Sequence, residues 1–182
     1  MIIEKPINKT NATEQLRRLY ETAFPQEEQI PWDDLMQLID TMPLDFTAYY
    51  DGDALMGFTI VYPRKSFNWF WYFAVPEPLR GKGVGQTILS QLIAKYKQCN
   101  NILDMEDPEQ ACENQAVRRR RHDFYSRNGF SDTGVGRSFG GIDFTIMKMG
   151  DRQFTMQDYD DIIAELHSYW DNMPKPQEQR LN

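Results

Sequence analysis

Three glycines lie close together in the stretch Arg80-Gly-Lys-Gly-Val-Gly-Gln86, between a run of aromatic and branched residues and an amphipathic segment. Glycine loses more conformational entropy on folding than other residues, so a cluster is expected where the backbone needs unusual angles or something approaches closely. Consecutive backbone N–H groups in such a turn converge on an anion, and the positive end of a following helix adds to the attraction. The stretch therefore predicts a site at which a diphosphate lies against bare backbone.

Spacing separates this turn from two other phosphate-binding loops. A Walker loop requires a lysine followed by Ser or Thr, whereas Lys82 is followed by Gly83. A dinucleotide fingerprint requires a further glycine at the position of Gln86, after the first strand of a parallel unit. Both alternatives fail, and an Arg-x-x-Gly-x-Gly turn at the start of a helix remains.

A second stretch that could do chemistry is Asp123-Phe-Tyr-Ser-Arg-Asn-Gly-Phe130, which follows four consecutive arginines, 118 to 121. Residues 114 to 130 hold five arginines and one acid, so they carry +4 and the rest of the chain carries −11 of the net −7. This distribution indicates a local anion site on an acidic body. Four consecutive positions of a helix point in four directions and form no flat basic face, so we predict no binding of nucleic acid.

Three carboxylates lie where they could hold a cation or take a proton. Glu106 follows a short apolar segment, 102 to 105, that predicts a buried strand, and it is a candidate base. Glu27 and Glu28 belong to an acidic loop between two predicted helices and are candidates for binding a cationic amine. For all three the alternative is a solvated loop carboxylate.

The hydrophobic pattern predicts the elements that position these residues. Asn11 with Glu14 reads as a capping box for a helix over 13 to 23, and Pro31 opens a second helix. The expected later elements are strands over 46–50, 55–62, 67–75, 102–105, 131–138 and 142–149, and helices from 84, over 114–127, and from Thr155 to about 170. This order predicts an α+β fold with a mixed, mostly antiparallel sheet and helices on both faces.

Composition limits the class of protein. The 182 residues are 41% hydrophobic, no apolar stretch approaches the roughly 20 residues that cross a bilayer, and no secretory signal is visible. We therefore expect one cytoplasmic domain over 1–173, no membrane contact, and a frayed tail over 174–182. Cys99 and Cys112 match no metal or redox spacing and are expected to be reduced structural thiols, so no metal is predicted.

Two motifs together resemble those of the GNAT superfamily of N-acetyltransferases. Arg80 to Gly85, after a strand ending in Val75, is similar to the family's acetyl-CoA motif Arg/Gln-x-x-Gly-x-Gly/Ala. The stretch from Asp123 to Phe130 is similar to its Phe-Tyr-x-x-x-Gly-Phe segment, and the element order agrees from Ile2 to about Met149. The resemblance implies the GNAT fold and direct transfer of an acetyl group from acetyl-CoA to a small amine, a lysine or an N-terminal amine.

The resemblance also implies roles for individual residues. The backbones of Phe73 and Val75 are expected to pair with the pantetheine arm, and Tyr125 to face the thioester sulfur and protonate the leaving thiolate. The pyrophosphate is expected to lie against Arg80, Gly81, Lys82, Gly83, Val84, Gly85 and Gln86. Seven residues before the tyrosine, where the family commonly has Asn, this chain has Arg118, which we expect to contact the cofactor.

Two alternatives stay open at this point. Tyr125 could be an aromatic packed on a helix face with its hydroxyl bonded to backbone, and the whole chain could be a noncatalytic CoA-binding regulatory or interaction module on the same fold. The expected partners are acetyl-CoA and an amine acceptor, and the late strands or the terminal helix are candidate contacts of a homodimer.

Overall fold

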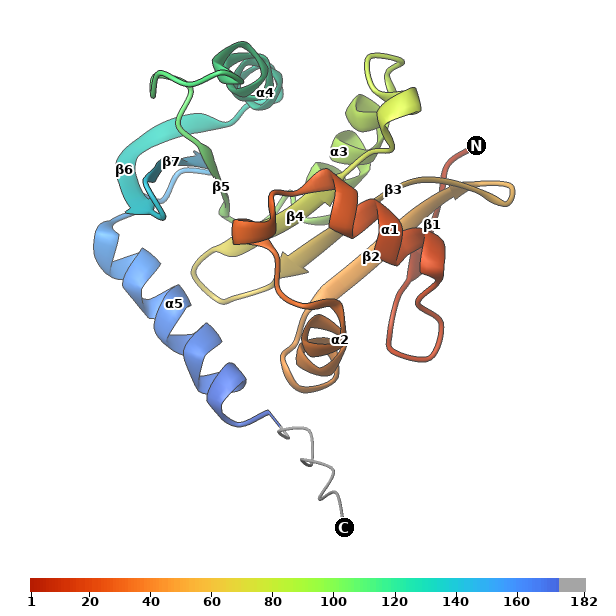
Figure 1. The fold of residues 1–182 in the computed structure, drawn as a ribbon. Helices are drawn as coiled ribbons and strands as arrows, with labels where there is room; N and C mark the ends of the chain where they lie inside the picture. Colours follow the sequence, from red (N-terminus) through yellow and green to blue (C-terminus); the bar gives the residue numbers. More distant parts are fainter. Residues whose placement is uncertain (174–182) are drawn as a thin grey trace.

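The computed structural model describes residues 1 to 173, so the predicted frayed tail lies outside the described residues. One seven-stranded sheet has the order β1-β2-β3-β4-β5-β7-β6 (Figure 1). The strands are β1 (Ile3–Pro6), β2 (Asp45–Asp51), β3 (Ala54–Tyr62), β4 (Asn68–Ala74), β5 (Asn101–Glu106), β6 (Ser131–Phe139) and β7 (Ile142–Met149). The helices are α1 (Glu14–Ala23), α2 (Trp32–Thr41), α3 (Val84–Lys95), α4 (Gln115–Arg127) and α5 (Met156–Asp171), with short 3-10 helices η1 (Gln26–Glu28) and η2 (Glu77–Leu79).

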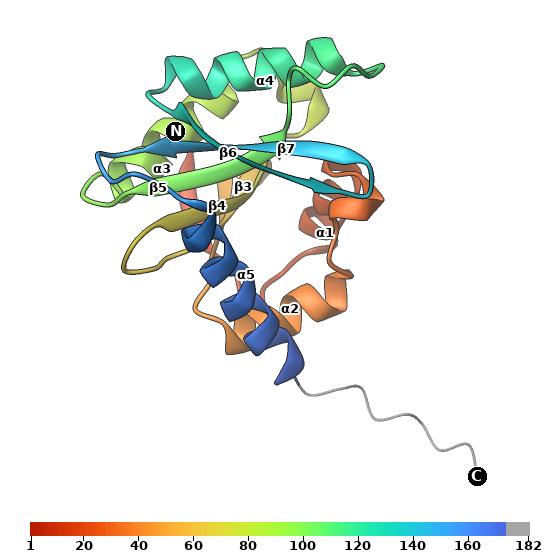
Figure 2. The same cartoon turned by 90° about the vertical axis from the view of Figure 1, so that its left-hand side faces the viewer.

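Helices cover both faces of the sheet, which confirms the predicted α+β fold. Figures 1 and 2 show α3 and α4 on one side of the strands and α1, α2 and α5 on the other. On the first side Leu89 and Leu92 of α3 are buried against the sheet, and on the second Leu16 and Leu35 are buried. All neighbouring strands run antiparallel except β4 and β5, which are parallel.

The sheet opens between β4 and β5. The two strands pair at Asn68–Asn101 and Trp69–Ile102, and no further pair between them follows within residues 1 to 173. A shift of register against β3 leaves Trp71 as an extra residue of β4, and a bulge of this kind bends a strand. The backbone of β4 beyond Trp69 therefore has a free edge toward β5, at which an extended ligand can pair.

One of the two predicted helix caps differs in the structure. Thr13, rather than Asn11, caps α1: its hydroxyl accepts from the Leu16 backbone N–H at 3.3 Å. The Asn11 side chain is used one turn earlier, where it donates to the Pro6 carbonyl at 3.0 Å. At the other end of the chain the predicted cap is confirmed, because Thr155 and Asp158 form a reciprocal capping box.

Gly57 of β3 lets α3 pack closely on the sheet. A Cβ added there would lie 2.6 Å from the Ala74 carbonyl oxygen and 2.8 Å from Cδ1 of Ile88. We expect Gly57→Ala to lower the free energy of unfolding by about 1 to 3 kcal/mol, because backbone and a buried side chain must move. Gly85→Ala is the matched control: its Cβ would be 3.7 Å from the nearest atom, so stability should hold or rise by up to about 1 kcal/mol. Urea unfolding followed by circular dichroism measures both changes. Equal losses of unfolding free energy in Gly57→Ala and Gly85→Ala would contradict this packing.

Candidate active site

A continuous pocket of about 1380 Å³ runs through the opening of the sheet, from the glycine turn before α3 to the inner side of α5. Most of the site residues expected from the sequence line it: Glu27, Glu28, Phe73, Val75, Arg80, Gly81, Gly83, Gly85, Gln86, Glu106 and Tyr125. Within the described part of the chain, the expected residues that do not line it are Lys82, Val84 and Arg118.

The glycine turn has the backbone that an anion site requires. Gly81 and Gly83 have φ of +73° and +82°, in the left-handed region that favours glycine. Gly83 caps α3 without a side-chain hydrogen bond, so the first backbone N–H groups of the helix have no acceptor within it. At Gly85 the fold leaves room for a Cβ, 3.7 Å from Val75 Cγ2. Protein packing therefore does not require glycine at 85.

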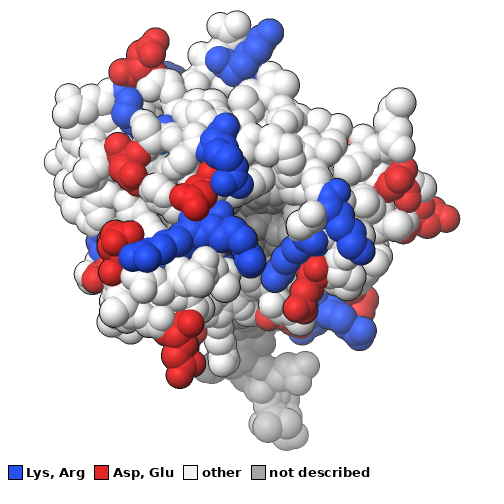
Figure 3. Space-filling view, turned by 90° about the horizontal axis from the view of Figure 1, so that it is seen from above, with Lys and Arg blue, Asp and Glu red and all other residues white. Residues whose placement is uncertain are grey.

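Cationic side chains surround this end of the pocket. Figure 3, which looks onto the side of α3 and α4, shows Lys and Arg side chains on both sides of a hollow. The arginines that line the pocket on this side are Arg80, Arg120, Arg121 and Arg127. The Arg80 side chain is fixed at the end of β4, because its Nε donates to the Val75 carbonyl at 3.0 Å. The rim is therefore complementary to a polyanionic ligand.

Arg118 lies away from the pocket, contrary to its expected contact with the cofactor. Its side chain is buried, with 5% of the residue exposed, and its Nη2 is 2.8 Å from Oε1 of Glu106. Its Nη1 donates to the Gln110 side chain at 3.0 Å. Consecutive arginines of α4 therefore have different surroundings. Arg118 is buried in the protein, Arg119 pairs with Glu109 at 3.2 Å on the surface, and Arg120 lines the pocket.

Glu106 is not the solvated loop carboxylate of the alternative interpretation, because it ends β5 and is 4% exposed. Both of its oxygens are engaged: Oε1 by Arg118, and Oε2 by Arg121 at 3.4 Å. Two guanidinium groups therefore occupy both oxygens of the Glu106 carboxylate, and neither oxygen is left free to face an acceptor. This pairing argues against the expected role of Glu106 as the base.

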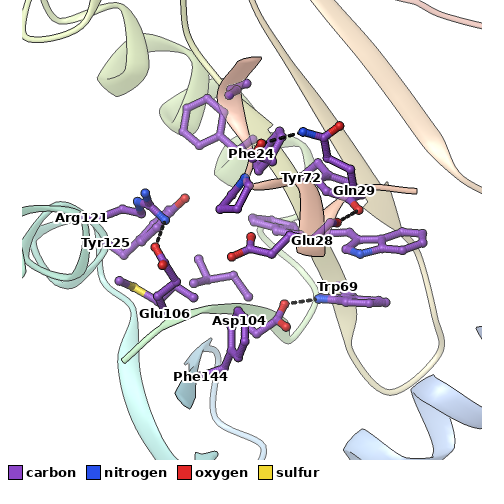
Figure 4. A pocket seen from close by; sticks show the side chains of 18 of the residues that line it. Phe24, Glu28, Gln29, Trp69, Tyr72, Asp104, Glu106, Arg121, Tyr125 and Phe144 are labelled. Carbon is purple, nitrogen blue, oxygen red and sulfur yellow. Dashed lines mark hydrogen bonds and ion pairs between the residues drawn. The ribbon is translucent and has the colours of Figure 1, made fainter. Parts of the chain in front are cut away.

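Glu28 presents a different environment. It points from η1 into the space that Asp104 and Glu106 also face (Figure 4), and its Oε1 is buried with no hydrogen-bond partner among residues 1 to 173. Burial raises the pKa of Glu28 to about 7, and the nearby Glu106 carboxylate adds to the rise while Arg121 opposes it. A half-buried carboxyl that has no ion-pair partner and a pKa near neutrality is typical of a general base. Its neighbour Glu27 is exposed at the rim.

Hydrogen bonds to backbone hold the segment that carries Glu28. The Tyr72 hydroxyl of β4 donates to the Glu28 carbonyl at 2.7 Å, and the Gln29 side chain donates to the Phe24 carbonyl at 2.6 Å. The Ile30 N–H donates to the Tyr20 hydroxyl at 2.8 Å. Because the buried side chains of Tyr72 and Tyr20 make two of these bonds, the core fixes the backbone of the segment that carries Glu28.

Tyr125 enters the pocket from α4, with its ring between those of Phe124 and Phe130 at centroid distances of 5.3 and 5.8 Å. Within residues 1 to 173 its hydroxyl makes no hydrogen bond, so the backbone bond of the alternative interpretation is not seen. Burial raises the pKa of Tyr125 to about 12, and Arg121 opposes the rise. The phenol is therefore protonated at neutral pH and free to donate to a ligand.

Sequence reasoning missed a second ion pair in the pocket. Asp104 of β5 accepts from the Trp69 indole at 2.9 Å and from Nη2 of Arg137 at 2.9 Å. The Arg137 guanidinium lies 4.3 Å from the centroid of the Phe144 ring. The two-residue period of a strand was the available signal, since it places Asp104 and Glu106 on the same face of β5.

The structure also bears on the predictions for metal sites, cysteines and membrane-spanning segments. No group of three or more His, Cys, Asp or Glu in the described part of the chain could hold a metal ion. Both Cys99 and Cys112 are free and exposed, rather than structural thiols of the core. No helix within residues 1 to 173 is long and apolar enough to cross a membrane.

Comparison with known proteins agrees with this geometry. The family model described as an acetyltransferase (GNAT) domain matches residues 44 to 132, which include the glycine turn and Tyr125. No curated protein matches the sequence. A solved structure from Bacteroides thetaiotaomicron, assigned as an acetyltransferase from the GNAT family, is 23% identical over 91% of this chain and 96% of its own, with a TM-score of 0.74.

Two further solved structures contain CoA compounds. A GNAT family acetyltransferase from Elizabethkingia anophelis with acetyl-CoA bound is 15% identical over 82% of this chain and 98% of its own, with a TM-score of 0.61. Naa50 from Arabidopsis thaliana, in complex with the bisubstrate analogue CoA-Ac-MVNAL, is 16% identical over 82% and 99%, with a TM-score of 0.59. With the family model and the fold in agreement, the chain contains a GNAT acetyltransferase domain, matched over residues 44 to 132.

Proposed function

We propose that this protein is an N-acetyltransferase that moves the acetyl group of acetyl-CoA directly to an amine. The observation that carries the proposal is the unpaired carboxyl of Glu28 in the same pocket as Tyr125 and the glycine turn. Acetyl-CoA is bound by one similar GNAT structure, and a CoA-containing bisubstrate analogue by another. These likenesses support acetyl-CoA as the donor here.

The residues present fit acetyl-CoA. The N–H groups at the start of α3 and the bare backbone of Gly83 and Gly85 suit a diphosphate, and Arg80, Arg120 and Arg127 suit the remaining negative charge. The free edge of β4, with Phe73 and the following Val75, suits the amide groups of a pantetheine arm, which can pair as a strand does. The donor's acyl end is then expected near Tyr125.

Glu28 is the group that prepares the acceptor. An alkyl amine has a pKa near ~10.4 and is mostly protonated at neutral pH, so it must lose a proton before it can attack. The Glu28 carboxylate accepts this proton, and the neutral nitrogen forms a bond to the acetyl carbon as the carbon–sulfur bond breaks. The second proton, which the nitrogen loses on becoming an amide, passes through solvent to the released thiolate. No covalent enzyme intermediate is needed.

Tyr125 and the backbone of β4 handle the negative charge that develops. The sulfur leaves as a thiolate, to which the Tyr125 hydroxyl donates a hydrogen bond. Because burial raises the pKa of Tyr125 to about 12, donation of a hydrogen bond is favoured over complete transfer of its proton. The Val75 N–H at the end of β4 is the expected donor to the acetyl oxygen, as a fixed dipole in a site that excludes water.

The ion-paired residues serve the site indirectly. Arg118 and Arg121 hold the Glu106 carboxylate beside the site, and after burial this carboxylate contributes most to the raised pKa of Glu28. We therefore assign the role of base to Glu28 and a positioning and electrostatic role to Glu106. A CoA-binding module without activity would need neither the unpaired carboxyl nor the free phenol.

Tyr125→Phe tests the proposal most simply. We expect it to lower kcat for thiol release from acetyl-CoA by about 10- to 100-fold, because one hydrogen bond to the leaving sulfur is lost. The affinity for acetyl-CoA, measured by calorimetric titration, should stay within about twofold, because the glycine turn is unchanged. Tight binding of acetyl-CoA by the wild type with no thiol release for any amine, unaffected by Tyr125→Phe, would favour the noncatalytic module.

A further inference from the structure

The part of the pocket beyond Glu28 has aromatic and aliphatic walls. Trp69 and Trp71 of β4 stack with ring centroids 4.7 Å apart and an angle of 21° between their planes. The α5 helix supplies the facing wall, through side chains that all line the pocket: Tyr159, Ile163, Leu166 and Trp170. We call this space, between the two tryptophans of β4 and these four residues of α5, the acceptor compartment.

The wall formed by α5 is held in place. Glu165 accepts from the Tyr62 hydroxyl at 2.6 Å and from Nε of Arg64 at 2.8 Å, which ties the helix to the end of β3 and the following loop. The rings of Tyr62 and Tyr169 pack edge to face with centroids 6.5 Å apart. The acceptor compartment therefore has a fixed width, and its shape can select among substrates.

Two of the three acids that face the interior of the pocket are held in ion pairs, and the third is not. Asp104 pairs with Arg137, and Glu106 pairs with Arg118 and Arg121. Glu28 has no such partner among the described residues, and the other acids of the lining, Glu27 and Asp171, are exposed at the rim. One unpaired carboxylate can bind one ammonium group, whereas a polyamine or a basic peptide would bring several.

We propose that the acceptor is a primary monoamine joined by a short linker to a flat aromatic group, as in an arylalkylamine. This inference rests on the proposed acetyl transfer and specifies its acceptor. The ammonium group binds at Glu28, and the aromatic group lies in the acceptor compartment between Trp71 and the side chains of α5. Burial of a phenyl-sized group favours binding, and stacking on an aromatic wall adds to it.

The test compares primary amines that differ in the apolar group. At saturating acetyl-CoA we expect kcat/KM for 2-phenylethylamine to exceed that for ethylamine by about 10- to 100-fold, because burial of the ring contributes to transition-state binding. Spermidine and a lysine-containing peptide should be poorer acceptors than 2-phenylethylamine. A preference for either of them would overturn the inference and leave the proposed acetyl transfer standing.

Two variants locate the effect in the acceptor compartment. Leu166→Trp fills it and should bring the ratio of phenylethylamine to ethylamine close to one, while Ala164→Trp adds the same bulk at an exposed position of α5 and should leave the ratio unchanged. Trp71→Leu removes the opposite wall and should lower the same ratio. Circular dichroism and acetyl-CoA affinity establish that each variant is folded.

The outcomes separate the two claims. An unchanged ratio in both Leu166→Trp and Trp71→Leu, with the fold intact, would overturn the assignment of the acceptor compartment. Absence of acetyl transfer to every amine in the panel, with acetyl-CoA bound, would overturn the proposed function and the inference with it.

Discussion

Glu28→Gln is expected to lower kcat/KM for the amine by about 10²- to 10⁴-fold at neutral pH, the usual contribution of a positioned general base. The amide is nearly the same size and can still occupy the space between Asp104 and Glu106, but it cannot accept a proton. The fold should be retained, because the segment is held through the backbone carbonyl of Glu28 rather than through its carboxylate. Thiol release at saturating acetyl-CoA measures the loss.

The pH dependence of kcat/KM tests the assignment of Glu28 as the base independently. The pKa of Glu28 is raised to about 7, and only the deprotonated form can accept a proton, so wild-type kcat/KM should rise as pH increases through about 7. Glu28→Gln should lose this rise and keep only the rise that comes from deprotonation of the free amine, with a pKa near ~10.4. Glu27→Gln, at the exposed neighbour, is the control and should keep the wild-type profile. A profile that loses its rise near 7 in Glu106→Gln but not in Glu28→Gln would return the role of base to Glu106.

Gly85→Leu is expected to weaken the binding of acetyl-CoA by about 100-fold or more, equivalent to about 2.7 kcal/mol. A Leu side chain at this position enters the space over the first turn of α3, where we place the diphosphate, and it cannot retreat into a packed core. Gly85→Ala is the matched control, since alanine occurs at this position of the acetyl-CoA motif that the sequence resembles. Calorimetric titration measures both affinities.

A loss of stability should not explain the weaker binding by Gly85→Leu. Gly85 does not have positive φ, and a leucine within a helix has higher intrinsic helix propensity than glycine. The melting temperature of Gly85→Leu should therefore stay close to that of the wild type. Wild-type affinity in a folded Gly85→Leu protein would place the diphosphate elsewhere.

Local patterns predicted the elements of the fold well. The two-residue period marked the strands from 46 to 75, and the glycines at 81 to 85 marked the start of α3 within a residue. Thr155 was recognisable as the cap of α5 because threonine at that position leaves its hydroxyl free to accept from the first turn. The cap of α1 was assigned to the wrong residue, because Asn11 and Thr13 are both good caps and only the preceding turn decides between them.

The site was predicted where backbone geometry decides it and missed where partners far apart in the sequence decide it. The glycine turn and Tyr125 belong to local motifs, and both line the pocket. The difference between Glu28 and Glu106 depends on Arg118 and Arg121, which lie on α4 and become partners of Glu106 only after folding. No pattern in the sequence around Glu28 shows that its carboxyl is buried without a partner.

Transfer of a labelled acetyl group tests the central claim most directly. The protein is incubated with acetyl-CoA that carries carbon-13 in the acetyl group and with 2-phenylethylamine, ethylamine and spermidine in turn, and the amines are analysed by mass spectrometry. We predict a labelled amide on an amine, formed in equal amount to the released thiol and strongly reduced in Glu28→Gln. Release of thiol with no labelled amide, or labelled amide formed equally well by Glu28→Gln, would contradict direct transfer with Glu28 as the base.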